Sequence, residues 1–230
     1  MKETGLDPRL LAAASLGRNG KVFADIGTDH AYLPVYLVES GRSPRGTASD
    51  IARGPCERAE RTVKTAGLSD RIAVRRRPGL DGVEDTGAED IYVLGMGGEM
   101  IAGIIGGSEY PKTAGIRLIM QPMTKQPELR SFLLSGGYRI ADETLVRSSG
   151  RIYQLICAEY DGIAREWTDT ELVLGKINAE KGGELFYDFA AATCRRYERI
   201  VRGLVAGGRE CGKEASILKE LRVIIRKSRE

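Results

Sequence analysis

The chain has 230 residues, of which 42% are hydrophobic and 6% aromatic, and its formal net charge is +3. This length allows one α/β core with an appendage, and four scattered cysteines without a C-x-x-C pair suggest neither a disulfide framework nor a thiolate metal cage. The single histidine, His30, excludes zinc sites that need several imidazoles, and no apolar stretch reaches the roughly 20 residues of a membrane helix. We therefore expect a cytoplasmic protein that uses no metal and contacts no membrane.

The region from residue 21 to about residue 160 alternates short apolar or β-branched runs with helical stretches. Ahead of it, Asp7-Pro8 predicts the start of a first helix, with Asp7 as N-cap. This alternation is typical of an α/β fold with a doubly wound, mostly parallel sheet. The predicted strands cover residues 21–25, 45–49, 71–76, 90–94, 115–120, 138–146 and 151–160, and the predicted helices lie near 30–39, 55–66, 99–105 and 127–134.

The last two predicted strands are joined only by residues 147–150. This connection is too short for a parallel crossover, so the two strands must form an antiparallel hairpin. A doubly wound sheet that ends in an antiparallel hairpin resembles the Rossmann-like class I methyltransferase fold more than a dinucleotide-binding dehydrogenase.

After residue 160 the strand signals stop and the sequence becomes helical. Thr168 to Glu171 predicts a capping box, and apolar side chains then recur every three or four residues at Phe186, Phe189, Thr193, Tyr197, Ile200 and Leu204. A shorter stripe follows Gly207-Gly208, so we predict an antiparallel, coiled-coil-like helical pair. We expect two domains, residues 1–162 as the catalytic domain and residues 163–230 as a C-terminal helical extension that binds the substrate.

Basic residues are concentrated at the C-terminal end. From residue 194 onward the sequence has eleven basic and five acidic residues, a net charge of +6, which leaves −3 for the first 193 residues. A basic segment is an electrostatic footprint for phosphate groups. Charge alone indicates a solvated helical face at least as well.

The turn after the first strand reads Asp25-Ile-Gly-Thr-Asp-His-Ala31. Its glycine, Gly27, permits a tight turn and a close ligand approach, and the following helix offers unpaired N–H groups. The dehydrogenase fingerprint G-x-G-x-x-G is absent, because Asp29 and His30 fill positions that a pyrophosphate needs small and uncharged. Carboxylates at Asp25 and Asp29 suit the sulfonium and ammonium groups of S-adenosylmethionine; the alternative is that they merely cap the turn.

Three further motifs lie at strand ends. Asp50 ends the second strand 23 residues after Gly27, near the interval of about 20 at which a carboxylate meets ribose hydroxyls in this architecture; capping of the next helix is the alternative. The fourth strand runs into Gly95-Met96-Gly97-Gly98, where backbone carbonyls and small residues would let a planar base approach a methyl group, unless the glycines only form a tight connection. Gln121-Pro122 follows the fifth strand and could present an amide to the substrate edge.

In their order along the chain, these motifs resemble those of the bacterial TrmK-like tRNA adenine-N1 methyltransferases, which modify position 22 of tRNA. The resemblance extends to about residue 160, and beyond it the helical tail agrees only in type. The matching segments are LDPRL at 6–10, ADIGTDHAYLP at 24–34, ASDI at 48–51, GP at 54–55, GMGG at 95–98, IMQP at 119–122, LR at 129–130, GY at 137–138 and IY at 152–153.

The resemblance implies S-adenosyl-L-methionine as cofactor and tRNA as partner, and we expect a monomer or weak dimer. Carried over residue by residue, it implies a cofactor site made of Asp25, Gly27, Thr28, Asp29, His30, Asp50, Ile51, Gly79 and Gly95. The catalytic residues implied are Asp29, His30, Gly95, Met96 and Gly97. As substrate contacts we expect Arg9, Arg77, Gln121, Pro122, Arg195 and Arg196. One position departs: where the family usually has G/S-D-G-L after the third strand, this chain has Pro78 before Gly79-Leu80.

Adenine N1 is a neutral in-plane nucleophile, so its methylation needs no prior deprotonation. Positive charge develops on the base, and either the Gly95 carbonyl or the Asp29 carboxylate is expected to accept a hydrogen bond from N6. His30 is either a later proton acceptor or a residue that orders the turn. Because N1 lies on the Watson–Crick edge, the base must leave its stack, and we expect the basic helical pair and the Arg75-Arg76-Arg77 run to hold tRNA phosphates.

Two other classes share parts of this pattern. A small-molecule methyltransferase would have the same cofactor site but would need no basic appendage. A non-catalytic RNA-binding protein with a degenerate cofactor site is favoured only by Pro78.

Overall fold

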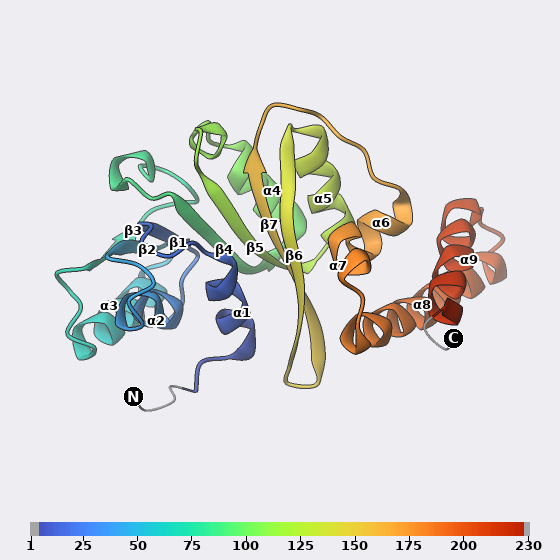
Figure 1. Cartoon of the computed structure of the whole chain (residues 1–230), viewed down its shortest axis with the longest axis horizontal. Helices are drawn as coiled ribbons and strands as arrows, with labels where there is room; N and C mark the ends of the chain where they lie inside the picture. The colour runs from blue at the N-terminus through green and yellow to red at the C-terminus, as the bar shows by residue number, and fades with distance from the viewer. Residues whose placement is uncertain (1–4, 228–230) are drawn as a thin grey trace. The chain divides into compact units, whose positions relative to one another are not determined.

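The computed structural model describes residues 5–227, which form two compact units with a boundary between Glu166 and Trp167 (Figure 1). In the first unit the helices are α1 (Pro8–Leu16), α2 (Tyr32–Glu39), α3 (Arg53–Thr65), α4 (Gly98–Gly106) and α5 (Gln126–Ser135), with short 3-10 helices η1 (Glu84–Thr86) and η2 (Tyr110–Lys112). The strands are β1 (Phe23–Ile26), β2 (Gly46–Asp50), β3 (Ile72–Arg76), β4 (Asp90–Gly97), β5 (Arg117–Thr124), β6 (Tyr138–Ser148) and β7 (Arg151–Tyr160).

The seven strands form one sheet in the order β3-β2-β1-β4-β5-β7-β6. Strands β1 to β5 pair in parallel, whereas β7 is antiparallel to both β5 and β6. This order reverses direction between β1 and β4, where ligands of open α/β sheets bind. The predicted Rossmann-like methyltransferase fold with its terminal hairpin is confirmed.

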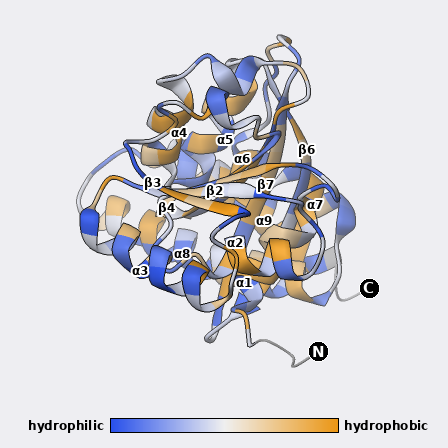
Figure 2. Cartoon of the chain, turned by 90° about the vertical axis from the view of Figure 1, so that its left-hand side faces the viewer, coloured by the Kyte–Doolittle hydropathy of each residue, from blue (hydrophilic) through white to orange (hydrophobic). Residues whose placement is uncertain are grey.

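Helices pack on both faces of the sheet, but of β2 and β3 only the face towards α3 is covered by a helix within residues 5–227. Apolar side chains of α1, α2 and α3 form one buried cluster with Tyr92 of β4 and Ile119 of β5, while α4 and α5 pack against β4 and β5. Asp7 begins α1 as expected, since its carboxylate accepts a hydrogen bond from the Arg9 backbone N–H at 2.8 Å. Figure 2 shows both hydrophobic and hydrophilic residues on the helices, as is typical of helices that pack on a sheet with one side and face solvent with the other.

The segment Gly95 to Gly98 differs from the expected loop. Strand β4 continues to Gly97, and its pairing with β5 is irregular between Leu94 and Gly97. Gly95 has a positive φ of 77°, which fits the irregularity. A Cβ at Gly98 would lie 2.2 Å from the Lys125 carbonyl oxygen, so this glycine allows α4 to start against the end of β5.

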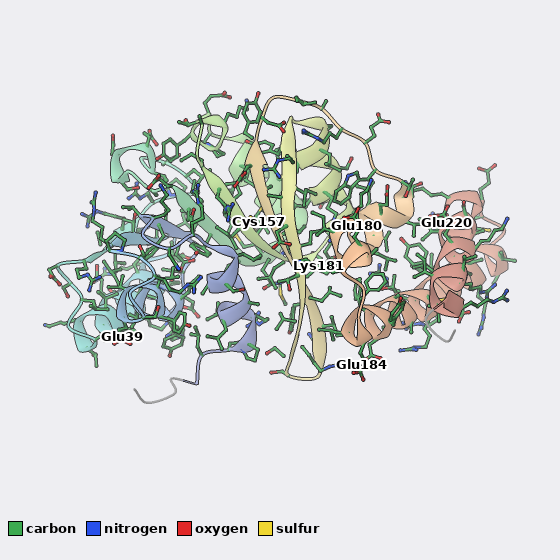
Figure 3. The ribbon with its side chains drawn as sticks, viewed as in Figure 1. Glu39, Cys157, Glu180, Lys181, Glu184 and Glu220 are labelled. Atoms are coloured by element: carbon green, nitrogen blue, oxygen red, sulfur yellow. The ribbon has the colours of Figure 1, made fainter. Side chains whose placement is uncertain are left out.

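The terminal hairpin is fastened by a buried ion pair. Arg130 of α5 donates to Glu143 of β6 at 2.7 Å and to Gln154 of β7 at 2.7 Å, and both charged side chains are fully buried. Cys157, labelled in Figure 3, lies on β7 between β5 and β6, and burial raises the pKa of its thiol to about 12. The thiol is therefore a core group and no nucleophile at neutral pH.

The second unit is helical, as expected. It contains α6 (Asp169–Leu174), α7 (Lys176–Lys181), α8 (Glu184–Ala206) and α9 (Gly212–Lys227), and α8 packs on α9. The predicted capping box at Thr168 is present. Ile200 of the predicted stripe is 39% exposed, whereas its neighbour Val201 lies on the side of α8 that meets α9. No helix within residues 5–227 is long and apolar enough to cross a membrane.

Candidate functional site

The turn after β1 is held by hydrogen bonds to the neighbouring strand. The backbone N–H groups of Gly27 and Thr28 donate to the Ser49 carbonyl of β2 at 2.7 and 2.9 Å, and the Thr28 hydroxyl accepts from the Ala31 N–H at 3.2 Å. Gly27 and Ala31 both have positive φ, 76° and 54°. For Ala31 this is a strained conformation, and it directs the chain into α2 without any side-chain cap.

Asp25, the third residue of β1, carries a carboxylate at the centre of this site. Its side chain is buried, with a hydrogen bond to Thr28, and it forms no ion pair with any residue in 5–227. Burial raises the pKa of Asp25 to about 6 because the ionised form loses its hydration. Such a carboxylate favours a cationic ligand, which would restore a partner for the charge.

Asp29 and His30 are the residues of the turn whose side chains face solvent, with exposed fractions of 60% and 40%. The Asp29 carboxylate is 60% exposed, and Arg58 of α3 donates to it through Nε at 2.9 Å and through a second nitrogen. His30 Nε2 lies 3.4 Å from the other Asp29 oxygen, and its ring is stacked on Tyr32 with centroids 5.1 Å apart. His30 does not cap α2, because the N-cap of that helix is Ala31 and it makes no side-chain hydrogen bond.

A cavity of about 220 Å³ opens at this turn, beside the carboxyl ends of β1 and β4. It brings together predicted residues from four places in the sequence: the turn itself, Gly95 on β4, Gln121 on β5 and Arg9 on α1. Arg9 also contacts Gln121 at 3.5 Å and lies over the Tyr153 ring. The residues that line the cavity are Arg9, Leu10, Asp25, Gly27, Thr28, Asp29, His30, Ala31, Tyr32, Leu33, Leu94, Gly95 and Gln121.

Other predicted residues lie outside the cavity lining. The Asp50 Oδ1 atom accepts from the Ala52 N–H at 2.6 Å, which leaves its second oxygen without a partner among the described residues. Met96 reaches over Gly27, where an added Cβ would collide with the end of the Met96 side chain. The remaining predicted residues outside the lining are Ile51, Arg77, Gly79, Gly97 and Pro122 in the first unit and Arg195 and Arg196 on α8 in the second.

Arg58 was missed by the sequence analysis. It follows Asp29 by 29 residues on a different helix, and no local motif marks it as a partner of that carboxylate. Tyr32 and Leu33 lie inside the matched turn motif, so their place in the cavity could have been expected. Within residues 5–227 no group of three or more side chains is arranged to hold a metal ion.

Comparisons with known proteins agree with this geometry. Residues 6–156 match a family model described as a methyltransferase domain. The chain is 37% identical over 171 residues to the tRNA (adenine(22)-N(1))-methyltransferase of Bacillus subtilis, an alignment that covers 71% of this chain and 72% of that protein. This chain belongs to the tRNA (adenine(22)-N1)-methyltransferase family.

Solved structures of TrmK-type proteins have the same fold. The crystal structure of Bacillus subtilis TrmK is 29% identical, with a TM-score of 0.80 and 97% of each chain covered. A Streptococcus pneumoniae protein described as a candidate tRNA (m1A22) methyltransferase, solved with S-adenosyl-L-methionine, is 26% identical with a TM-score of 0.82; 94% of this chain and 98% of that chain are covered. The likeness extends over the helical second unit, where the sequence resemblance was weakest.

The burial of Asp25 predicts an unusual pH dependence of stability. The folded state keeps this proton up to about pH 6, whereas the unfolded state loses it near pH 3.8, so stability should fall as the pH rises through this window. Asp25→Asn should therefore stabilise the ligand-free protein above pH 7, by about 3 kcal/mol, with the gain shrinking to nothing near pH 4. Urea unfolding across this pH range measures the difference, with the exposed Glu39→Gln as the control; a pH-independent gain would contradict the assignment.

Proposed function

We propose that this chain transfers the methyl group of S-adenosyl-L-methionine to N1 of an adenine in tRNA, the adenine at position 22. The observation that carries the proposal is the buried, unpaired carboxylate of Asp25 in a cavity at the switch point of the sheet. The family relationship supplies the substrate, since the Bacillus subtilis relative is named for this reaction. We further propose that the protein acts in the cytoplasm, where its tRNA substrate would be met, as a monomer or weak dimer.

The residues present fit S-adenosylmethionine. Asp25 offers a buried anion for the cationic methionine end, with Gly27 and Thr28 lining the same cavity. Asp50 retains one carboxylate oxygen for the ribose, and Ile51 and Gly79 would meet the adenosine end. When bound, the cofactor supplies an electrophilic methyl group on its sulfonium.

The acceptor adenine needs room and a hydrogen-bond acceptor. Gly95 leaves open space, since a Cβ built on it would meet no atom within 4 Å. Asp29 is the exposed carboxylate in the cavity lining, and the Arg58 contact still leaves it lone pairs for a further donor. We assign to Asp29 the hydrogen bond from N6, which strengthens as positive charge develops on the base. His30, within reach of Asp29, would take the N6 proton afterwards.

The remaining predicted residues have supporting roles in this proposal. Met96 and Gly97 would border the base beside Gly95, and Gln121 and Pro122 would meet its edge together with Arg9. Because N1 lies on the Watson–Crick edge, the base must be extruded, and this requires contacts beyond the cavity. We assign these contacts to the C-terminal helical domain, residues 163–230, where Arg195 and Arg196 are exposed on α8.

Mass-spectrometric mapping tests the proposed reaction directly. Unmodified tRNA incubated with the protein and S-adenosylmethionine should gain one N1-methyladenosine, at position 22. The matched control is tRNA whose position 22 is guanine, which should stay unmethylated. Methylation of a small molecule in preference to tRNA would refute the proposal, as would methylation elsewhere in tRNA.

Single-turnover methylation separates the role of Asp29 from that of its partner. Asp29→Asn should lower the rate at saturating cofactor by about a hundredfold, because it removes a charged acceptor that acts in the transition state. Arg58→Gln should lower it by less than about tenfold, because Arg58 only holds that carboxylate. Equal losses in the two variants would show that the ion pair orders the turn, and the N6 contact would then pass to the Gly95 carbonyl.

The role of α8 is tested by removing its exposed cations. Arg195→Ala combined with Arg196→Ala should weaken tRNA binding by about tenfold and reduce its salt dependence, while cofactor affinity stays unchanged. The matched control is Arg53→Ala combined with Arg139→Ala, which removes two exposed arginines already paired with Glu57 and Glu159. If both double variants bind tRNA alike, α8 does not hold the substrate.

A further inference from the structure

A second hollow lies on the opposite flank of the sheet from β4 and β5, over β2 and β3. Its volume is about 490 Å³, and four arginines line it: Arg45, Arg71, Arg75 and Arg77. Thr47 of β2 also lines it. We call these five residues the arginine basin. Two acids, Asp70 and Asp85, stand among the other lining residues.

The basin exists because, within the described part of the first unit, no α-helix covers one face of β2 and β3. Ala48, Ile72 and Val74 point into the apolar cluster with α3, so the alternating residues Thr47 and Arg75 point to the other face. The chain that crosses that face, from β3 to β4, contains only the three-residue η1. A single 3-10 turn is too small to cover two strands, and the hollow remains.

Within residues 5–227 the arginines of the basin have no acidic partner, and the Thr47 hydroxyl has no hydrogen-bond partner. None of the four arginines forms an ion pair within residues 5–227, and the hydrogen bonds of Arg71, Arg75 and Arg77 go to backbone carbonyls. The Thr47 side chain is only 7% exposed, and its hydroxyl oxygen has no hydrogen-bond partner. An unpartnered buried hydroxyl is costly. Beside four arginines that form no ion pair and that outnumber the two acids of the lining, it indicates an anion.

We propose that the arginine basin binds consecutive backbone phosphates of the tRNA substrate, an inference that rests on the proposed function. Arg71 and Arg77 flank the two ends of β3, which places their backbones roughly 20 Å apart at 3.3 Å per residue. That separation exceeds what one phosphate ion can bridge and suits a row of phosphodiesters. Arginine is also the side chain best shaped for phosphate oxygens.

The basin is continuous with the edge of the sheet that carries the cofactor cavity. The Arg77 N–H donates to the Asp50 carbonyl at 3.0 Å, and Arg76 donates to the Ile51 carbonyl at 3.1 Å. These hydrogen bonds hold the end of β3 beside the end of β2, where Asp50 is assigned to the cofactor ribose. A strand of RNA in the basin would therefore run from the carboxyl edge of the sheet, near the reacting base, towards its amino edge at Arg45.

The test compares two double variants in the full chain. Arg45→Ala combined with Arg75→Ala should raise the Kd for tRNA by about tenfold and reduce the slope of log K against log salt by about 2. Both side chains are exposed, so the fold should persist, and cofactor affinity should not change. Arg53→Ala combined with Arg139→Ala removes the same charge from paired, exposed arginines and should change the Kd by less than about twofold.

A third variant tests the role of Thr47, the buried residue of the basin. Thr47→Val keeps the side-chain shape but removes the unpartnered hydroxyl, so it should raise the thermal unfolding midpoint while weakening tRNA binding about threefold. A merely structural Thr47 would leave tRNA binding unchanged.

The outcomes separate this inference from the proposed function. If the wild-type protein methylates tRNA and the Arg45/Arg75 double variant binds tRNA like its control, the basin proposal is overturned while the function stands. If that variant loses only the binding of inorganic phosphate, measured by calorimetry, the basin takes a small phosphorylated ligand and the proposal is again overturned. If the wild-type protein leaves tRNA unmethylated, the proposed function fails, whereas a tenfold loss of tRNA binding in the variant would still support the basin.

Discussion

The structure of the site depends on one constraint, a carboxylate buried without a countercharge at the end of β1. Every residue of β1 is buried, and Asp25 lies between β2 and β4 with only the Thr28 hydroxyl as a side-chain partner. The apolar cluster beneath α1, α2 and α3 has to stabilise the fold against this cost. A group that weakens the folded state at neutral pH is explained by a ligand that binds it, and a sulfonium or ammonium is such a ligand.

The same turn shows how backbone strain places the outer residues. Ala31 adopts a left-handed conformation despite its Cβ, and this sets the start of α2. As a result Asp29 and His30 lie before the first turn of the helix. Asp29 accepts a hydrogen bond from Arg58, and the His30 ring stacks on the Tyr32 ring. The inner carboxylate and the outer carboxylate, four residues apart, thus have different environments and different proposed tasks: Asp25 for the cofactor and Asp29 for the base.

Local patterns in the sequence predicted the sheet with its terminal hairpin and the helical pair, because each depends on periodicity or on the length of a connection. They also predicted the part of the cavity lining that lies between Asp25 and His30, because these residues are contiguous; the roles assigned to them stay predictions. They failed where strands pair irregularly: Gly95 to Gly97 were expected in a loop, yet they continue β4 alongside β5. They also missed Arg58 and Arg45, whose positions depend on contacts between segments far apart in the chain.

The cofactor cavity and the arginine basin are complementary in charge, and topology explains why. Around β1 the sheet reverses its strand order, which leaves a crevice where a carboxylate can face a cation. Over β2 and β3 the crossover to β4 forms only the 3-10 helix η1, which leaves a face where arginines can meet anions. A methyl transfer to RNA joins a cationic donor to a polyanionic acceptor, so the enzyme needs both signs of charge on separate surfaces. The reversal of strand order forms the cofactor cavity, and the absence of a helix over β2 and β3 within residues 5–227 exposes the arginine basin.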